Sequence, residues 1–388
     1  MHAGPSLEPD NPASAAAMLA EAAALGKSLV PRGSGTKLRG DAGSLSYIST
    51  RRLTAGLEHY AGDLVATAPA GCTLRDVNDV LARQRQWIPL DPPFGDRATI
   101  GGIVAANDSG PRRHRFGSPR DLIIGVHVAL TSGTVAHSGG RVVKNVAGYD
   151  LGRLFCGSFG SLGLITSVTF KLAPIAPASR TVVARFAREG DAVAAAIELA
   201  ASVSLTPSAL EVRAPDPRLL VRFDSTPQSA QHMAASTASL LASRSADIAI
   251  VDSEAEAAVW ADHHACESAE NGLAARVSVL PMAAAAVYGL VRRLGAEIGV
   301  DWIMTGRAAL GVLRVQATGD QARLQRFAAA LRTNVTAQKG HVQFVAGGEI
   351  LGQAVDPHGP VGTAAAVGLA VKQRFDPARV LPYPWARE

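Results

Sequence analysis

Cysteine, aromatic residues and long apolar runs are scarce in this chain, and each scarcity excludes a class of protein. The three cysteines, Cys72, Cys156 and Cys266, lie far apart and form no CxxC pair. The chain alone therefore predicts neither a zinc knuckle nor an iron–sulfur site. An odd number of cysteines gives no disulfide framework, which is typical of a reducing compartment.

No segment resembles a signal peptide or a membrane span. Glu8 and Asp10 precede any apolar run, unlike the start of a secreted protein. The longest nearly uncharged stretch of the second half, 277–291, contains Pro281 and is shorter than the roughly 20 residues that a span needs. We expect a cytoplasmic protein that reaches a membrane, if at all, through partner subunits.

The charge balance argues against a nucleic-acid binder. Lysine and arginine (38) exceed aspartate and glutamate (33) by a net charge of +5, spread along the sequence. A dedicated binder would show a basic stripe with interleaved aromatic residues. With 388 residues and 47% hydrophobic content, the chain predicts two or three compact domains.

The distribution of glycine and proline indicates a domain boundary near residue 175. The first part is glycine-rich, and its β-branched runs at 123–130 and 164–172 predict strands. The second part alternates alanine-rich helical stretches with short strands, which predicts a sheet covered on one side by helices. The predicted strands there are 181–186, 219–223, 248–251 and 313–317, and the predicted helices are 192–201, 228–242, 254–269, 283–297 and 321–333.

Helix signals also occur near the start of the chain. Asn11 can cap a helix that has Pro12 at its first position and ends at Gly26. A strand is expected at 28–30. Leu74, Val77, Val80 and Leu81 have helical spacing, which predicts a helix over 74–85.

Three glycine-rich segments, 31–37, 99–107 and 156–166, leave bare backbone where a ligand could approach. In the first, successive N–H groups could converge on a diphosphate, although an ordinary hairpin loop would look similar. In the second, a double glycine followed by small residues offers a surface for a flat ring. A tight turn into a buried helix is the alternative there.

The order of these segments resembles the PCMH-type FAD-binding domain shared by vanillyl-alcohol oxidase, D-lactate dehydrogenase and related flavoproteins. Over about residues 10–175 the resemblance is carried by PRGSGT, PAGCTLRDVNDVL, DPPFGDRATIGGIVAAN, RFGSPRDLIIGVHVAL and GGRVVKNVAGYDLGRLFCGSFGSLGLITSVTFKLAP. The motifs DPPFGDRATIGG and GGRVVKNVAGYDL look most like those of the FAD-binding subunit of glycolate oxidase. The resemblance implies an α+β protein, with an FAD-binding domain of two α/β subdomains over 1–175 and an α+β cap domain over 176–388. The last residues could return to the first domain.

The resemblance also implies which segments contact FAD. Segment 32–37 would wrap the pyrophosphate, 99–107 would run along the flavin and diphosphate, and 157–165 would reach the adenine side through backbone groups. The expected contact residues are Pro31, Arg32, Gly33, Ser34, Gly35, Thr36, Lys37, Gly71, Pro92, Pro93, Thr99, Gly101, Gly102, Ala105, Asn107, Gly157, Ser158, Gly160, Gly163 and Ile165.

Two departures from the family pattern carry expectations. Covalent relatives attach FAD to a histidine or cysteine in these loops, and here only His114 is present, among arginines. We therefore expect noncovalent FAD. The chain ends in FDPARVLPYPW, without the asparagine-proline-glycine of the family, so contacts of this ending near the flavin are expected to differ.

Residues for oxidising a 2-hydroxy acid are less evident. Catalytic relatives carry a histidine cluster with two histidines one residue apart, and this sequence has no His-x-His. His263 and His264 are adjacent, so on a helix they point about 100° apart and cannot chelate one ion together. We interpret both as residues of a surface helix, interpret His341 as structural, and expect no metal.

Arginines are the remaining catalytic candidates. Arg113 and Arg115 belong to the densest positive cluster, which could bind a substrate carboxylate, stabilise a reduced flavin, or simply form a solvated loop or subunit contact. Arg307, in MTGRAALG, is the cap residue expected to face the flavin. In GGRVVKNVAGYDL, which also contains Lys144 and Tyr149, a turn held by Asn145 and Asp150 is a sufficient explanation.

These observations predict an FAD-dependent oxidoreductase subunit of a glycolate oxidase type complex, which oxidises a small 2-hydroxy acid. The subunit would hold FAD for electron transfer or assembly. Its partners would be a second flavoprotein subunit with the histidine cluster and an iron–sulfur subunit. A self-sufficient FAD-dependent 2-hydroxy acid dehydrogenase and a structural subunit without flavin are the alternatives.

Overall fold

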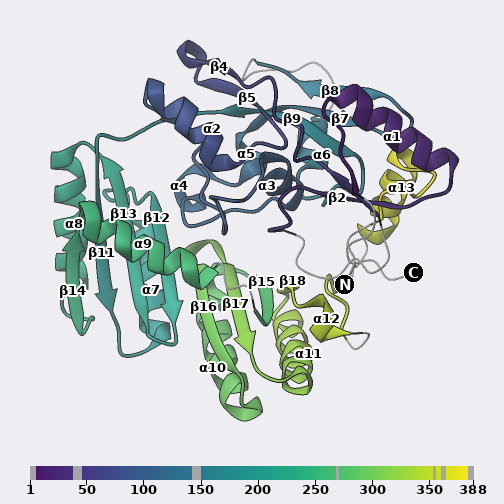
Figure 1. The fold of residues 1–388 in the computed structure, drawn as a ribbon. Coiled ribbons are helices and arrows are strands. Elements are labelled where there is room, and N and C mark those ends of the chain that lie inside the picture. Colours follow the sequence, from purple (N-terminus) through teal and green to yellow (C-terminus); the bar gives the residue numbers. More distant parts are fainter. Residues whose placement is uncertain are drawn as a thin grey trace. The chain divides into compact units, whose positions relative to one another are not determined.

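The computed structural model describes residues 6–37, 46–141, 150–267, 271–352, 355–359 and 364–382. They form two compact units (Figure 1). The first contains the described residues of 1–110, 116–175 and 361–388, and the second those of 111–115 and 176–360.

A three-stranded parallel sheet opens the first unit. Its order is β1 (Ser6–Leu7), β3 (Ser46–Ser49), β2 (Leu29–Arg32), and α1 (Pro12–Ala24) connects β1 to β2. The Asn11 side chain accepts a hydrogen bond from the Ser14 N–H at 2.8 Å and caps α1. The predicted N-terminal helix and the strand after it are confirmed.

A five-stranded antiparallel sheet forms the second layer of this unit. Its order is β4 (Glu58–Tyr60), β5 (Val65–Pro69), β9 (Leu164–Lys171), β7 (Ile123–Ala129), β8 (Val135–Gly139). Its apolar face packs against α2, α3 and α6. The remaining elements of this part are α2 (Leu74–Leu81), β6 (Gln86–Trp87), α3 (Ile100–Ala106), α4 (Arg113–Phe116), α5 (Pro119–Leu122), α6 (Leu151–Phe155), β10 (Ala173–Pro174) and α13 (Ala365–Phe375). The two layers confirm the predicted fold class.

Two segments of the first unit differ from the structure predicted for them. The helix from Leu74 stops at Leu81, because the chain continues as a single 3-10 turn to Gln84 and Arg85 adopts a left-handed φ of 54°. The segment 99–107 contains the short buried helix α3, and Asn107 ends it with a φ of 45°. The segment thus forms the turn into a buried helix that was the alternative, and residues of that helix also line the pocket described below.

The second unit is one antiparallel sheet of eight strands, built from two βαββαβ halves. The first half has the strand order β14–β11–β13–β12, and the second has β16–β17–β15–β18. The halves join where β12 pairs with β16, from Val212 opposite Gly306 to Ala214 opposite Met304. Their elements are β11 (Ala178–Arg185), α7 (Glu189–Ala201), β12 (Ala209–Ala214), β13 (Arg218–Ser225), α8 (Pro227–Leu241), β14 (Asp247–Val251), α9 (Ser253–Glu267), β15 (Leu273–Ser278), α10 (Ala284–Ile298), β16 (Asp301–Arg307), β17 (Val312–Thr318), α11 (Gln321–Ala337), β18 (His341–Ala346) and α12 (Gly348–Leu351).

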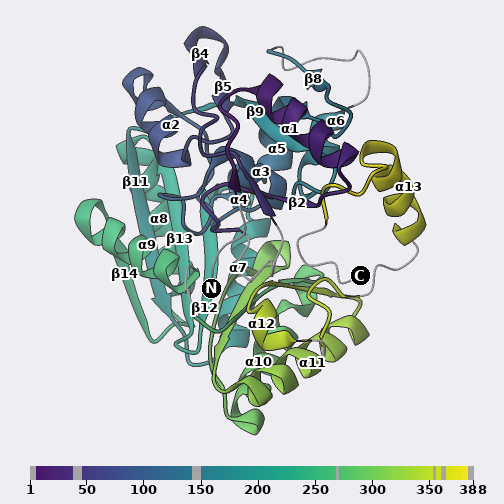
Figure 2. The ribbon, with the colours of Figure 1, turned by 45° about the vertical axis from the view of Figure 1, so that its right-hand side comes forward.

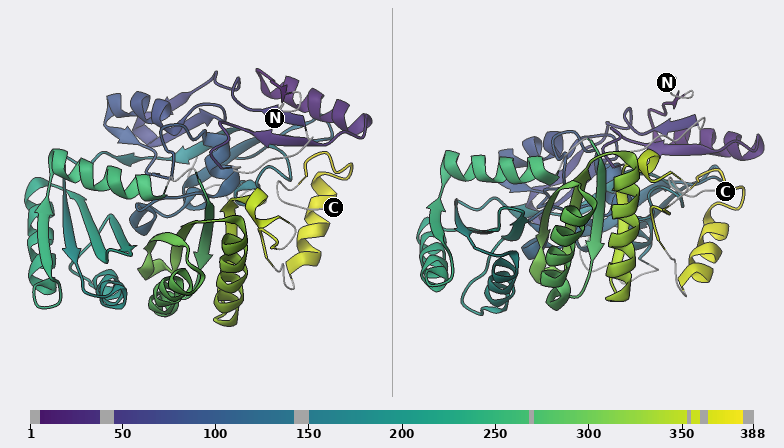
Figure 3. Two further views of the ribbon diagram at one scale, coloured as in Figure 1. Left: turned by 60° about the horizontal axis from the view of Figure 1, so that its bottom comes forward. Right: turned by 90° about the horizontal axis from the view of Figure 1, so that it is seen from below.

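The two faces of this sheet differ in polarity. One face is apolar and packs against α7, α8, α10 and α11, which lie along it (Figure 3). The opposite face carries charged side chains and is crossed by α9, whose Trp260 packs on Ala209 and Leu220. The predicted one-sided helical cover is thus wrong for α9, because every second residue of these strands points away from the main core.

All the helices and strands predicted for the second unit are present, with ends shifted by a few residues. The strands β12, β15 and β16 had not been predicted. Their sequences, ALEVRA, LAARVS and DWIMTGR, carry charged or small residues at alternate positions. Those residues belong to the polar face, so the strands lack the continuous β-branched run that signals a buried strand.

Candidate functional site

A pocket in the first unit brings together the predicted glycine-rich segments. It is lined by the end of β2 with the loop after it, by the start of α3, and by the loop that enters β9. The predicted residues among its lining are Pro31, Arg32, Gly33, Ser34, Gly35, Thr36, Lys37, Thr99, Gly101, Gly102, Ala105, Gly160, Gly163 and Ile165. Thr50, Ala106, Phe159 and Leu164 also line it and had not been predicted.

The loop after β2 lies against the start of α3. A Cβ on Gly33 would stand 2.1 Å from the Thr99 Oγ1 atom, so only glycine fits at this approach. Gly35 has a φ of +81°, in the left-handed region that glycine adopts without strain. Both glycines are therefore required by the geometry of the loop.

Several polar groups at this pocket have no protein partner. Among the described residues, the backbone N–H groups of 33–36 have no hydrogen-bond acceptor. The hydroxyls of Thr50 and Thr99 are buried without a partner. Buried polar groups are normally paired, and a phosphate-bearing ligand would supply acceptors for the N–H groups and hydroxyls alike.

The two cations of the loop have different environments. The Lys37 ammonium lies 2.7 Å from an Asp108 carboxylate oxygen and donates to the Pro93 carbonyl at 2.6 Å, and both members of the ion pair are nearly buried. Arg32 is exposed, and its guanidinium lies 4.9 Å from the centre of the Tyr47 ring. Because Asp108 neutralises Lys37, Arg32 is the better-placed cation for a diphosphate.

The third glycine-rich segment, 156–166, is held against α3 by backbone hydrogen bonds. The N–H groups of Gly157 and Phe159 donate to the carbonyls of Val104 and Ala105 at 3.0 and 2.8 Å. Gly160 has a φ of +78°, and a Cβ there would lie 2.9 Å from Pro31 side-chain atoms. The third segment and the loop after β2 therefore meet at Gly160 and Pro31.

Six predicted contact residues do not line the pocket. Pro93 accepts the Lys37 bond and follows Pro92 in the chain. Asn107 caps α3, and the Ser158 hydroxyl donates to the Phe155 carbonyl next to Gly157. At Gly71 a Cβ would stand 2.2 Å from the Thr50 carbonyl oxygen. These residues support the segments that form the pocket.

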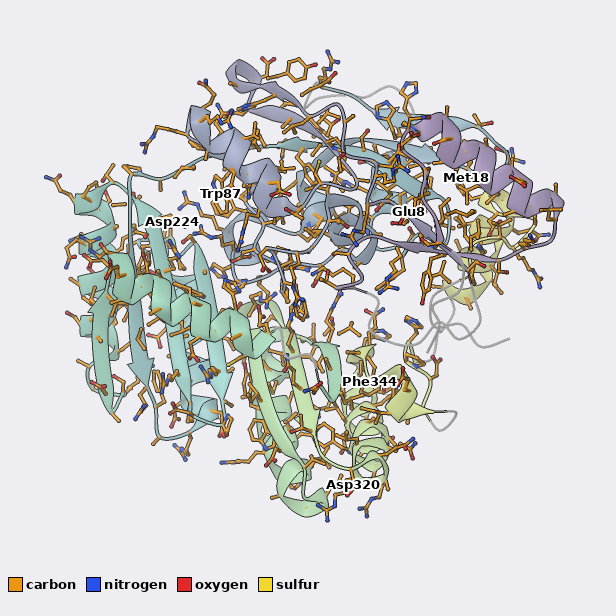
Figure 4. All side chains as sticks on the ribbon, viewed as in Figure 1. Glu8, Met18, Trp87, Asp224, Asp320 and Phe344 are labelled. Atoms are coloured by element: carbon orange, nitrogen blue, oxygen red, sulfur yellow. The ribbon has the colours of Figure 1, made fainter. Side chains whose placement is uncertain are left out.

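Arginines of segment 111–115 are bound to the second unit's sheet. Asp224, on β13, is labelled in Figure 4. Arg112 forms an ion pair with it, and Arg115 donates to the Asp224 carbonyl at 3.3 Å. Burial alone would raise the pKa of Asp224, but the positive charges of Arg112 and Arg222 leave that pKa below its usual value. Arg113 is half-buried in this segment. The segment is thus anchored to the sheet rather than solvated.

Arg307 lies in a buried ionic cluster on the polar face of the sheet. It is 1% exposed and lies 2.6 Å from carboxylate oxygens of both Glu211, on β12, and Glu267, on α9. Arg314 lies 3.5 Å from Glu267. Burial would raise the pKa of Glu267, yet Arg307, His264 and Arg314 hold it well below its usual range. The guanidinium of Arg307 thus contacts two buried carboxylates, whose combined charge is balanced only with Arg314, and it is closed off from solvent.

The histidines of α9 differ from the surface-helix expectation. His263 is fully buried, with Nε2 3.5 Å from Glu211, whereas His264 is partly exposed and 3.8 Å from Glu267. The expectation is therefore wrong for His263, since α9 turns that side toward the sheet. Glu211, His263 and Glu267 have ligand atoms within 4.8 Å of one another. Arg307 already supplies positive charge to both carboxylates there, so the cluster carries its own counter-charge.

Part of GGRVVKNVAGYDL lies outside the described residues, including Lys144, Asn145 and Tyr149. Asp150 is described, and its side chain accepts the Arg153 N–H at 3.2 Å to cap α6. The turn predicted from Asn145 and Asp150 together stays a prediction, because Asn145 lies outside the described residues. In the described part of the chain, no helix has the length and apolarity to cross a membrane.

Parts of the chain are similar to known proteins. Residues 6–139 match the family described as "FAD binding domain". The chain is 35% identical over 200 residues to glycolate oxidase subunit GlcD of Bacillus subtilis, covering 50% of this chain and 42% of that protein. It is 43% identical over 125 residues to glycolate oxidase subunit GlcE of Escherichia coli, covering 32% and 36%. A probable mitochondrial D-lactate dehydrogenase of Danio rerio is 32% identical over 177 residues, covering 44% and 35%.

The chain thus spans about two fifths of the length of the curated relatives it matches. Among solved structures, an alkyldihydroxyacetonephosphate synthase superposes with a TM-score of 0.70 at 14% identity, covering 97% of this chain and 76% of that one. That likeness shows a shared fold.

A Gly33→Ala substitution should abolish FAD retention while leaving the fold intact. The added Cβ would displace the Thr99 hydroxyl and open the loop where its N–H groups converge. Flavin absorbance per protein after gel filtration measures the effect. Gly62→Ala is the matched control, because a Cβ there meets nothing within 4 Å. Equal flavin content in both variants would show that the close approach is irrelevant to binding.

Arg307→Met should lower the free energy of unfolding by about 3–5 kcal/mol, since it leaves buried carboxylates without their main counter-charge. Urea denaturation followed by circular dichroism measures this. The control Arg293→Met removes only an exposed salt bridge to Glu297, one helical turn away. It should lower the free energy of unfolding by less than about 1 kcal/mol. Similar midpoints for the two variants would contradict the role given to Arg307.

Proposed function

Because this chain carries the FAD-binding domain of the PCMH-type flavoprotein superfamily, we propose that it is the FAD-binding subunit of a glycolate oxidase type complex. In this proposal the complex oxidises a small 2-hydroxy acid, and the subunit holds FAD for electron transfer or assembly. The observation that supports it most is the pocket, where a glycine cradle, unpaired N–H groups and two orphaned threonine hydroxyls coincide.

The pocket residues suit the parts of FAD differently. Segment 32–37 offers backbone N–H groups and the exposed Arg32 to the pyrophosphate. The small residues Gly101, Gly102 and Ala105 on α3 offer a surface without bulky side chains. The segment that contains Gly160 and Gly163 offers backbone to the adenine side. When bound, FAD supplies a two-electron acceptor.

The other requirements of hydroxy acid oxidation are a cation for the carboxylate and a base for the hydroxyl proton. Arg113 and Arg115 are the arginines that we propose as candidates for contact with an anionic group or a partner. Arg307 is a poorer candidate than its sequence context suggests, because its guanidinium is committed to Glu211 and Glu267. His263 is enclosed within the same cluster, so it is poorly placed to accept a proton from a substrate.

The partners follow from what this chain would need. A second flavoprotein subunit with the family's histidine cluster would supply the base or metal. The names of two relatives, glycolate oxidase subunits GlcD and GlcE, support a complex of several subunits. The three cysteines are free thiols in separate places, so an iron–sulfur subunit would be the partner needed if the electrons pass to a quinone.

Denaturing the purified protein in acid should release its FAD into the supernatant. None of the described residues that line the pocket is a histidine or a cysteine, so no side chain there can form the usual covalent flavin link. Absorbance at flavin wavelengths in supernatant and pellet is the measurement. Yellow colour that stays with the pellet would overturn the noncovalent assignment, and a colourless purified protein would support the structural subunit without flavin.

The isolated chain should bind FAD without oxidising glycolate or lactate appreciably. Loss of a positioned general base typically removes a factor of about 10²–10⁴ in rate. Anaerobic mixing with each acid, followed by flavin absorbance, tests this, and addition of the histidine-bearing subunit should restore turnover. Rapid bleaching of the isolated chain's flavin by either acid would instead establish the self-sufficient dehydrogenase.

A further inference from the structure

The C-terminal segment 365–382, which contains α13 (Figure 2), belongs to the first unit. The Phe375 ring contacts the Phe155 ring edge to face, with centroids 5.4 Å apart. Val380 and Leu381 are buried in the core cluster that contains residues of α1 and β2. The segment is therefore an integral part of this unit.

Lys372 on α13 joins three parts of the chain through one ammonium group. It donates to the Ser161 carbonyl at 2.7 Å and to the Leu381 carbonyl at 2.6 Å, and it forms an ion pair with Asp376. An ammonium has three N–H donors, so these partners use its full capacity. Ser161 lies between Gly160 and Gly163, both of which line the pocket.

Asp376 completes the arrangement from a fully buried position. Its carboxylate accepts the N–H groups of Val380 and Leu381 at 2.9 and 2.8 Å, besides pairing with Lys372. The turn that it holds places the Val380 carbonyl 2.7 Å from the Leu29 N–H at the start of β2. β2 leads directly into the loop that contains Gly33 and Gly35.

We propose that Lys372 and Asp376 are positioning residues that brace two FAD-binding segments, one through the Ser161 carbonyl and the other through Val380 and β2. This inference rests on the proposed function of the pocket. The two segments meet at Gly160 and Pro31, so a brace that spans both fixes their separation. Lys372 and Asp376 need not contact the cofactor to control how tightly it binds.

The chemistry of the pair explains why charge is needed at this place. Charge-assisted hydrogen bonds are shorter and stronger than neutral ones, and a fully buried carboxylate needs a cation or several donors. Removing the ammonium leaves the Ser161 carbonyl without this donor and Asp376 without its counter-charge. The segment 157–163 then loses its tie to α13 and samples other separations from Pro31.

The test compares FAD dissociation constants of the full-length apoprotein by flavin fluorescence titration. Lys372→Met and Asp376→Asn should raise the constant at least tenfold and change the circular dichroism of the bound flavin. Lys372→Arg, which keeps the charge and several donors, should bind within about threefold of wild type. Should Lys372→Met fail to fold, Lys372→Gln replaces it, with an expected rise between those of Met and Arg.

Two controls separate positioning from general stability. Gln373→Met changes an exposed neighbour on the same helix and should leave the constant unchanged. Val77→Ala removes buried side-chain volume from the core of the same unit at α2, at a residue that does not line the pocket, and should lower the urea midpoint without a comparable change in the constant or in the flavin spectrum.

The outcomes distinguish this inference from the function on which it rests. Wild-type protein that binds no FAD would overturn the proposed function itself. Wild-type binding together with unchanged constants in the Lys372 and Asp376 variants would overturn the brace alone. The brace would also be overturned if Val77→Ala weakened binding as much as Lys372→Met, because the effect would then be one of stability.

Discussion

The close approach of backbone segments around one pocket is the constraint on which the first unit depends. Gly33 lies against Thr99, and Gly160 lies against Pro31, at distances that leave no room for a Cβ. Each approach joins segments that are distant in the sequence, and the hydroxyls of Thr50 and Thr99 at the pocket have no protein partner. The same packing that closes the unit therefore also produces its candidate binding site.

The second unit depends on a different interaction, between buried charges. Its two βαββαβ halves share a short strand pairing at β12 and β16, and the cluster of Glu211, Arg307 and Glu267 spans that junction from both halves and from α9. A sheet with one apolar and one charged face requires such compensation wherever the charged face is buried. Arg307, which its sequence context suggested as a substrate-facing residue, is therefore used within the protein to pair buried carboxylates.

Much of the local structure could be predicted because its signals are local. Asn11 with Pro12, and the spacing of Leu74, Val77 and Leu81, specify helices through capping and periodicity. The strands β12, β15 and β16 escaped prediction because tertiary contacts, rather than local runs, bury their polar residues. The burial of His263 escaped for the same reason, since it depends on which side of α9 faces the sheet.

The sequence by itself determined the order of the glycine-rich segments, because backbone conformation and ligand approach restrict those positions to glycine and small residues. The resemblance of these ordered segments to a known family supplied the fold class and FAD as the cofactor. Only the tertiary structure decided how the charges are used. Lys37 pairs with Asp108, Arg307 with two glutamates, and Lys372 with Asp376 and Ser161. A charge has no periodic signal along the chain, and its role follows from the partner that folding places beside it.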